Sequence, residues 1–249
     1  MLGTVAREWL SWVDPFVCEL CGRGGLDGGQ VGPDCRGSLV PVEPPFCAVC
    51  GEPAEGSFIP SGLCRRCAAA PPSFEEARAV YVNTGSLRDL LLAFKYGGAV
   101  HLAGSFAQMM AEAVRGNLHW FGGKERLLVP VPMHRVKQAQ RGYNQAQELA
   151  ELLGKELDWP YAGVLKRLPD TLPQASLSRE QRLRHARKIY AADEKGMKRR
   201  PVRGRDVLLV DDVFTTGATA DSCARLLLRA GAASVCVLTL ARTHHAWRG

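Results

Sequence analysis

Apolar residues after position 72 follow two spacings, one typical of buried strands and one typical of amphipathic helices. Short apolar runs predict strands at 77–83, 126–132, 162–168, 206–210 and 234–240. Apolar residues three or four apart predict helices at 87–94, 102–114, 144–157 and 218–230, and a short basic helix is expected at 178–187. Alternating strands and helices are typical of an α/β fold, in which helices cover a parallel sheet and ligands bind at the carboxyl ends of the strands.

The first 72 residues lack this alternation and hold seven of the nine cysteines. The linker AAAPPSF at 68–74 ends the segment. We therefore expect two parts, an N-terminal helix with a small Cys-rich zinc-ribbon module at 1–72 and an α/β domain at 73–249.

The second half of the Cys-rich segment has the spacing of a metal site. Two CxxC turns joined by a short loop can hold one zinc ion with four thiolates. Rubredoxin-like iron and a redox pair are the alternatives. Because metal binding supplies much of the folding free energy of so small a module, we expect the zinc to be structural. The predicted ligands are Cys47, Cys50, Cys64 and Cys67.

The first half of the segment is a partial copy of the second. A shift of 29 residues superimposes Cys18, Cys21 and Cys35 on three of the four predicted ligands and leaves Ser38 opposite the fourth. Alternatively, the missing ligand lies at Gly32, three residues before Cys35. In either case three thiols remain, so we expect weak, distorted or absent metal there, with Asp34 or water as a poor substitute.

Composition limits the class of protein. Of the 249 residues, 46% are hydrophobic and 23% charged, which is typical of a globular chain and excludes disordered or low-complexity architecture. No apolar run reaches 18 residues, so no membrane insertion is expected. Arg7 and Glu8 interrupt the stretch where a secretory signal would be apolar, which predicts a cytoplasmic protein. In a reducing compartment, clustered cysteines favour metal binding over disulfides.

Charge is distributed unevenly along the chain. The formal net charge is +7, with −3 in residues 1–72 and +10 in 73–249. Residues 179–205 hold 11 basic and 3 acidic side chains. Such a block attracts polyphosphates, nucleic acid or an acidic membrane surface, although it can also be a solvated loop and helix face. The acidic Cys-rich segment favours scaffolding or protein contact over nucleic acid.

The stretch VLLVDDVFTTGATA at 207–220 carries the most specific pattern in the chain. An apolar strand brings two carboxylates to its carboxyl end, and a small, hydroxylated loop then opens a helix. Backbone N–H groups, hydroxyls and the helix dipole there can hold a phosphate, while the carboxylates can accept hydrogen bonds from ribose hydroxyls. The predicted binding residues are Asp211, Asp212, Thr215, Thr216, Gly217, Ala218 and Thr219.

This stretch resembles the phosphoribosyl-pyrophosphate (PRPP) signature of type I phosphoribosyltransferases. Together with the Cys-rich start, the segments FKYGG (94–98), VPVPMHRVKQAQRGYNQAQELA (129–150) and LPDTLPQASLSREQRLRHARKIY (168–190) resemble the ComF/GntX family. The resemblance implies a type I phosphoribosyltransferase fold that binds PRPP, or a related ribose 5-phosphate, with magnesium. It also implies that the loop after Pro130, with Arg135 and 141–144, faces the pyrophosphate.

Two cations outside the signature are further candidates. Arg141 precedes a glycine at the mouth of a helix, where a guanidinium can bind phosphate oxygens in a bidentate manner. Lys95 can act as a point charge, although an ordinary solvated helix end explains it equally well. The resemblance adds a flap with Thr171, Gln174 and Arg182, where His185 replaces the usual asparagine.

Three functions remain open at this stage. The resemblance implies a ComF-like role in handling single-stranded DNA during uptake and natural transformation, with a ComF-type helicase as a candidate partner. The basic segment and Tyr143, Tyr161 and Tyr190 are compatible with base stacking. An active phosphoribosyltransferase with an unknown nitrogen nucleophile is the alternative, and no catalytic residue is assigned. Thr215 stands where purine-salvage enzymes have an aspartate, which disfavours purine salvage. A GntX-like metabolic role is the third.

Overall fold

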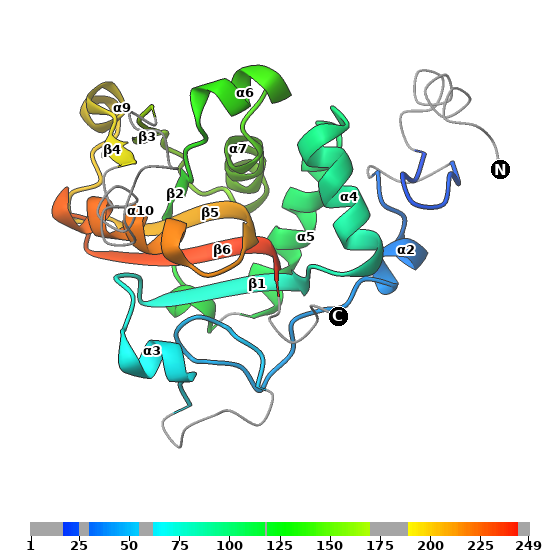
Figure 1. The fold of residues 1–249 in the computed structure, drawn as a ribbon, viewed down its shortest axis with the longest axis horizontal. Helices are drawn as coiled ribbons and strands as arrows, with labels where there is room; N and C mark the ends of the chain where they lie inside the picture. The colour runs from blue at the N-terminus through cyan, green and yellow to red at the C-terminus, as the bar shows by residue number, and fades with distance from the viewer. Residues whose placement is uncertain (1–16, 25–29, 55–61, 118, 170–188, 244–249) are drawn as a thin grey trace, which may run out of the picture.

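A four-stranded parallel sheet forms the centre of the molecule (Figure 1). The computed structural model describes residues 17–24, 30–54, 62–117, 119–169 and 189–243. The strands run in the order β1-β6-β5-β2. Because all four are parallel, their carboxyl ends meet at one edge of the sheet, where α/β proteins bind ligands. They are β1 (Glu76–Val82), β2 (Leu127–Pro130), β5 (Asp206–Phe214) and β6 (Ser234–Arg242).

Helices cover both faces of this sheet, which confirms the predicted fold class. The helices α4, α5 and α7 pack in one hydrophobic cluster on one face, and α10 packs in a second cluster on the other (Figure 1). β5 and β6, in the middle of the sheet, are buried on both faces, as their continuous apolar runs predict. The four helices are α4 (Gly85–Tyr96), α5 (Leu102–Gly116), α7 (Gln145–Leu157) and α10 (Ala218–Arg229).

The expected strand at 206–210 is too short. Asp211 and Asp212 lie inside β5 rather than in a loop, because the pairing with β6 continues to Phe214 opposite Arg242. The polar residues at the end of the apolar run are therefore held in extended backbone on the sheet. The longer strand thus holds the two carboxylates of the site on a rigid element.

The expected strand at 162–168 is also modified. Only β3 (Leu165–Arg167) forms, and it pairs antiparallel with β4 (Tyr190–Ala192) in a separate two-stranded sheet. The sequence reading did not anticipate β4, because its partner lies far away in the chain. It also did not anticipate the short helices, which are α2 (Pro33–Gly37), α3 (Arg65–Ala69), η1 (Trp120–Gly123), α6 (Arg135–Arg141) and α9 (Glu194–Arg199).

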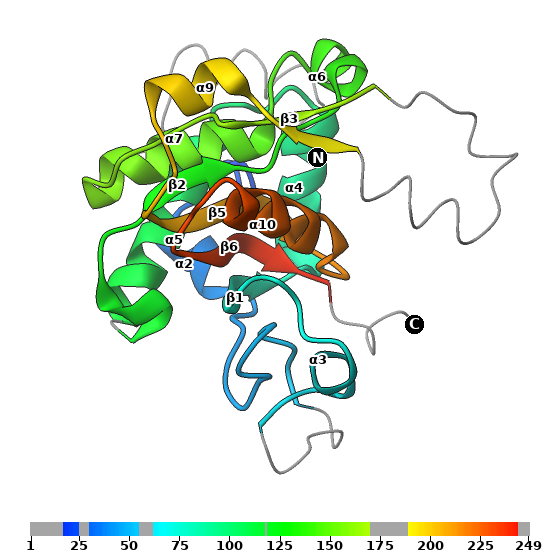
Figure 2. The same ribbon diagram turned by 90° about the vertical axis from the view of Figure 1, so that its left-hand side faces the viewer.

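The Cys-rich segment contacts the α/β domain in two places. Residues 40–54 and α3 lie along β1, at the edge of the sheet (Figure 2). The N–H of Ala77 donates to the carbonyl of Val49 at 2.7 Å, and the N–H of Val42 donates to the carbonyl of Val80 at 2.9 Å. α2 lies instead against α5, on the face of the sheet that α4, α5 and α7 cover. None of the described helices is long and apolar enough to cross a membrane.

Candidate functional site: a cationic cavity at the sheet edge and two cysteine clusters

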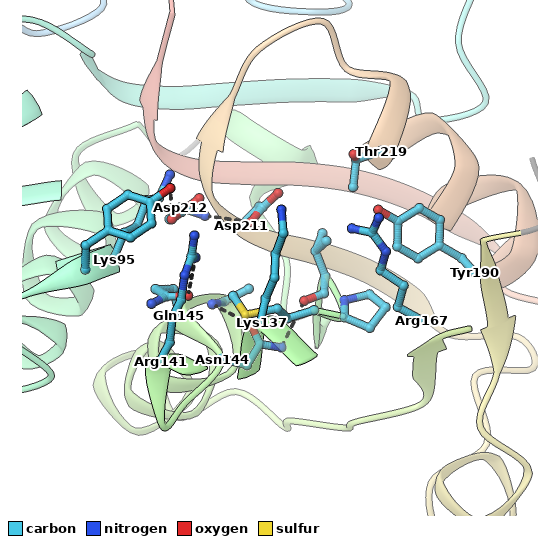
Figure 3. A pocket seen from close by; sticks show the side chains of 15 residues that line it. Lys95, Lys137, Arg141, Asn144, Gln145, Arg167, Tyr190, Asp211, Asp212 and Thr219 are labelled. Carbon is cyan, nitrogen blue, oxygen red and sulfur yellow. Dashed lines mark hydrogen bonds and ion pairs between the residues drawn. The ribbon is translucent and has the colours of Figure 1, made fainter. Parts of the chain in front are cut away.

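A cavity of about 210 Å³ opens at the carboxyl ends of β2 and β5 (Figure 3). Four cations and two carboxylates line it, so its surface suits a polyanion that also carries hydroxyl groups. The cations are Lys95, Lys137, Arg141 and Arg167, and the carboxylates are Asp211 and Asp212. The other labelled residues around it are Asn144, Gln145, Tyr190 and Thr219.

The two carboxylates differ in their surroundings. Lys95 Nζ lies 3.0 Å from Asp212 Oδ2, so the cation that ended the predicted helix points into the cavity. Asp211 Oδ1 accepts the N–H of Asp212 at 2.9 Å. Burial and the neighbouring Asp212 carboxylate raise the pKa of Asp211 to about 8. At neutral pH these surroundings therefore favour a proton on Asp211, which a bound cation would displace.

The sequence RGYNQ at 141–145 locks two walls of the cavity together. The Tyr143 hydroxyl and Gln145 Nε2, the latter at 3.1 Å, both donate to the carbonyl of Phe94, the residue before Lys95. Asn144 caps α7 by accepting the N–H of Ala146 at 3.1 Å, and its Nδ2 donates to the carbonyl of Val131 at 3.2 Å. These contacts fix α4, β2 and α7 relative to one another.

Arg141 lies in the cavity wall, and the short helix α6 supplies a second cation there. Arg141 Nη1 donates to Gln145 Oε1 at 3.2 Å, and its guanidinium lies 4.7 Å from the centre of the Tyr96 ring. Lys137, one helical turn before Arg141, lines the same cavity. Both also line an adjoining hollow of about 380 Å³. Arg135, which the family resemblance also directs toward the pyrophosphate, is exposed and lines neither space.

The predicted phosphate loop lies at the amino end of α10. Gly217 adopts φ 78° as the N-cap of this helix. A Cβ on Gly217 would lie 2.7 Å from Phe214 Cζ, so glycine is needed here because an aromatic ring packs beneath the loop. Thr219 lines the cavity, whereas Thr215 and Thr216 are exposed beside it. The helix dipole and the amide groups of this end attract an anion.

Part of the cavity wall beside Thr219 comes from Tyr190, which the sequence singled out only for base stacking, and from Arg167, which it did not single out. Arg167 of β3 and Tyr190 of β4 are paired in register, and the Arg167 guanidinium lies 5.7 Å from the Tyr190 ring centre. Burial is the main cause that raises the pKa of Tyr190, so its hydroxyl stays protonated. The helical spacing of Lys137 and Arg141 could have revealed Lys137. No sequence signal pairs Arg167 with Tyr190. The other two predicted stacking residues, Tyr143 and Tyr161, are half-buried against the core.

The second Cys cluster has the geometry of a four-thiolate metal site. The Sγ atoms of Cys47, Cys50, Cys64 and Cys67 lie within 4.8 Å of one another. Cys50 Sγ and Cys64 Sγ are 3.7 Å apart. A tetrahedral zinc site with Zn–S bonds of about 2.3 Å requires sulfur atoms about 3.8 Å apart, so these thiols fit zinc. The N–H of Cys64 donates to Cys47 Sγ at 3.3 Å and Arg66 Nη2 approaches Cys50 Sγ at 3.7 Å, contacts that favour thiolates.

The first Cys cluster repeats these contacts with one thiol fewer. The N–H of Gly32 donates to Cys18 Sγ at 3.4 Å, as the N–H of Cys64 does in the second cluster. Gly32 is the N-cap of α2 with φ −65° and ψ 159°, and Cys64 is the N-cap of α3 with φ −72° and ψ 158°. Gly32 therefore occupies the place of the missing ligand, and Cys35 that of Cys67.

Ser38, the other possible position of the missing ligand, and Asp34, its possible substitute, both have other partners. The Ser38 hydroxyl donates to the carbonyl of Cys35 at 2.7 Å. The Asp34 carboxylate pairs with Arg23 at 3.0 Å, and both side chains are exposed. Within the described ranges, the group that could hold a metal there consists of Cys18, Cys21 and Cys35.

Several sequence expectations fall outside the described residues. These are the N-terminal helix in 1–16, the short basic helix at 178–187, the basic residues at 179–188 and the flap residues Thr171, Gln174, Arg182 and His185. Six basic residues of the 179–205 block lie in the described part and are exposed. They are Lys195, Lys198, Arg199, Arg200, Arg203 and Arg205.

Comparison with known proteins adds two family matches. The double zinc ribbon domain model matches residues 9–70, and the phosphoribosyl transferase domain model matches residues 107–248. Competence protein F of Haemophilus influenzae is 29% identical over 230 residues, covering 91% of this chain and 97% of that protein. The DNA utilization protein YhgH of Escherichia coli is 32% identical over 201 residues, covering 80% of this chain and 84% of that protein.

A solved structure is also similar. The glutamine PRPP amidotransferase from B. subtilis, complexed with ADP and GMP, matches with 18% identity and a TM-score of 0.39. The match covers 59% of this chain and 30% of the amidotransferase chain, so this chain spans under a third of that enzyme's length.

Proposed function

The chain belongs to the phosphoribosyl transferase domain family and to the family of the DNA utilization protein YhgH, and from this premise we propose that it binds PRPP or a related ribose 5-phosphate. The observation that carries the proposal is the cavity at the end of β5. There, two carboxylates on a rigid strand face four cations, and a helix amino end lies beside them. The carboxylates suit the ribose hydroxyls, and the α10 loop at 215–219 suits the 5′-phosphate.

The pyrophosphate and its magnesium ion would lie at the cationic side of the cavity. Lys137 and Arg141 on α6 can bind phosphate oxygens, and Arg141 is already oriented by Gln145. Magnesium takes oxygen ligands, and Asp211 and Asp212 together with the ligand's own phosphates offer them. The raised pKa of Asp211 fits this assignment, because a divalent cation favours the charged carboxylate.

We propose structural zinc in the second cluster, on Cys47, Cys50, Cys64 and Cys67, and weaker binding in the first. The zinc-ribbon module at 1–72 and the α/β domain at 73–249 then form the two parts of the protein. A reducing compartment keeps these thiols available as ligands, so we propose that the protein works in the cytoplasm.

Calorimetric titration with PRPP and magnesium tests the small-molecule proposal. We expect binding to the wild type and a loss of about tenfold or more in Asp212→Asn, because that carboxylate faces the cavity. Arg141→Gln should weaken binding by a similar factor. Arg135→Gln is the matched control on the same helix, since Arg135 lies outside the cavity, and it should bind as the wild type does. Equal losses in the two arginine variants would contradict the assignment.

We propose that the biological role is in DNA uptake and the handling of single-stranded DNA. The printed names of the two relatives, Competence protein F and DNA utilization protein YhgH, support this role. The exposed cations of α9 and the segment after it add a surface that a nucleic-acid backbone can bind. The family resemblance adds a ComF-type helicase as a partner.

Salt dependence tests the DNA proposal. Single-strand binding should weaken steeply between 50 and 200 mM salt, since each phosphate contact releases counterions. The double variant Arg199→Glu with Arg200→Glu should reduce both the affinity and the slope. Arg88→Glu reverses an exposed charge on α4 and serves as the control. Binding that does not respond to salt, or that responds equally to both changes, would count against the proposal.

Transferase activity is the second candidate, and the family model of phosphoribosyl transferases favours it. Thr215 is exposed beside the cavity and offers no carboxylate as a general base, so the acceptor would have to be acidic enough to react unaided. Release of pyrophosphate from PRPP that depends on a nitrogen nucleophile and disappears in Asp212→Asn would establish it. A panel of nitrogenous bases without release would leave ligand binding as the function. The GntX-like metabolic role gains no support from any described contact.

A further inference from the structure

A buried arginine links the second Cys cluster to the phosphate loop. We propose that Arg242 is a positioning residue through which zinc at the second cluster and ribose phosphate at 215–219 strengthen each other's binding. The inference rests on the proposed function, because it takes this loop as the phosphate site. It concerns a coupling between two sites that neither family match describes.

Arg242 joins the end of β6 to residues 47–52 of the second Cys cluster, which we call the knuckle. Its residue exposure is 1%, although it is the last residue of its strand. Arg242 Nη1 donates to the carbonyl of Cys50 at 2.7 Å, and Nη2 forms an ion pair with the Glu52 carboxylate. A buried guanidinium is costly to desolvate unless such partners are in place. Its position therefore depends on the fold of residues 47–52.

The same guanidinium contacts the residue beneath the phosphate loop. It lies 5.2 Å from the centre of the Phe214 ring, at the end of β5. The space above this ring is full, because a Cβ on Gly217 would lie 2.7 Å from Phe214 Cζ. A shift of the ring toward the loop therefore has to move Gly217, and with it the backbone that begins α10.

A second contact from the Cys-rich side reaches the same helix. The ring of Phe74, which follows α3, meets Phe214 edge-on with 6.1 Å between ring centres. The N–H of Ser73 donates to Asp221 Oδ1 at 2.7 Å, in the first turn of α10. Arg242 thus contacts the ring that packs against the loop, and the chain that follows α3 contacts both this ring and the first turn of α10.

Metal binding controls one end of this connection. A CxxC knuckle of this size has little core of its own, so loss of zinc frees the carbonyl of Cys50 and the Glu52 carboxylate. Arg242 then loses its partners, and Phe214 loses the cation that fixes its ring. Coupling of two binding equilibria is reciprocal, so a ligand that orders the loop must also favour the metal-bound knuckle.

Zinc release measures this coupling without any activity assay. The experiment uses the full chain carrying Cys21→Ser, which reduces the first cluster to two thiols, so that the zinc measured is that of the second cluster. Zinc is transferred from this protein to a colorimetric chelator that does not bind magnesium. Saturating PRPP with magnesium should slow the transfer about fivefold or more. PRPP binding is measured on the same sample by calorimetry.

Variants assign the coupling to its residues. Arg242→Lys keeps the charge but loses the bidentate fork, and it should lose most of the slowing while still binding one zinc. Phe214→Leu should do the same and serves if the first variant does not fold. Arg78→Lys is the matched control. Arg78 also donates to the knuckle, at the carbonyl of Ala48 at 3.1 Å, but its ring contact is with Phe46, so the slowing should persist.

Three results would overturn the inference. If PRPP binds and zinc leaves the Cys21→Ser protein at an unchanged rate, the inference is wrong and the proposed function stands. If Arg242→Lys and Phe214→Leu retain the slowing, coupling runs through other residues and Arg242 has no positioning role. If PRPP does not bind at all, the proposed function fails, and the inference fails with it.

Discussion

The two Cys clusters repeat one local structure but rest on different parts of the molecule. The second contacts β1 and, through Arg242, the end of β6 beside the phosphate loop. The first contacts α5, where the N–H of Gln30 donates to Ser105 Oγ at 2.7 Å and Arg36 Nη2 donates to Gln108 Oε1 at 2.8 Å. The copy fastened to the sheet edge has four thiols, and the copy fastened to a helix has three. We therefore propose that the cluster with four thiols is the one that influences ligand binding.

The thiols of the second cluster are also more buried than those of the first. Three thiol residues of the second cluster are buried and Cys64 is half-buried, whereas Cys21 of the first cluster is exposed. A metal in the second cluster replaces a hydrophobic core for its module, while the first cluster is open to water on one side. The comparison predicts that the two clusters contribute unequally to stability and to ligand binding.

The largest expected effect is removal of one thiol from each cluster. Cys67→Ser should release the zinc of the second cluster and destabilise the fold by about 3 kcal/mol or more, because a structural metal supplies folding free energy. Cys21→Ser should cost less than about 1 kcal/mol. Zinc content and thermal denaturation of both variants give the comparison. Equal losses would show that the first cluster is as essential as the second.

Completing the first cluster should have the next largest effect. Gly32→Cys places a thiol where Cys64 lies in the other copy, and the backbone angles of the two positions already agree. We expect one more tightly held zinc per chain and a gain of about 1–2 kcal/mol in stability. Ser38→Cys is the control at the alternative position and should not gain zinc. If Ser38→Cys gains zinc and Gly32→Cys does not, the structural equivalence is wrong.

Ligand affinity should respond to only one of two arginines that join the Cys-rich segment to the domain. Arg242→Lys should weaken PRPP binding about fivefold, since it loosens Phe214 under the loop. Arg36→Lys removes the contacts to Gln108 and Glu112 on α5 and should change the affinity less than twofold. Calorimetry at one magnesium concentration measures both. A comparable loss in Arg36→Lys would remove the distinction between the two contacts.

The smallest effect concerns pH. Because the pKa of Asp211 is raised to about 8, this carboxyl group holds a proton below that pH, and magnesium with PRPP must displace it. Affinity should therefore rise about threefold from pH 7.5 to pH 8.5 and then level off, with proton release seen in buffers of different ionisation enthalpy. Cys21→Ser should show the same profile, and Asp211→Asn should show none.

The raised pKa of Asp211 also makes the stability of the protein depend on pH when no ligand is added. The folded protein holds the Asp211 proton more tightly than the unfolded chain does, so its stability falls as the pH rises from about 4 to 8. Asp211→Asn should relieve this loss at pH 8. Thermal denaturation at pH 6 and pH 8 measures the difference.

The sequence was sufficient for the sheet, its covering helices and the two carboxylates, because apolar spacing reports burial directly. It was not sufficient where pairing decides the structure. Asp211 looks like the start of a loop, yet pairing with Thr239 keeps it in β5. Arg167 and Tyr190 meet only because two distant short strands pair. The missing thiol of the first cluster had two possible positions in the sequence, and the backbone angles at Gly32 and its N–H contact with Cys18 Sγ distinguish them.

We propose above all that the end of β5 and the start of α10 bind a ribose phosphate. Backbone amide resonances of the full chain, followed by NMR during addition of ribose 5-phosphate with magnesium, test it residue by residue. We expect the largest shifts at 215–219 and at Asp211 and Asp212, with saturation at one ligand per chain. Shifts confined to other elements, or no saturable shift in these residues, would contradict it.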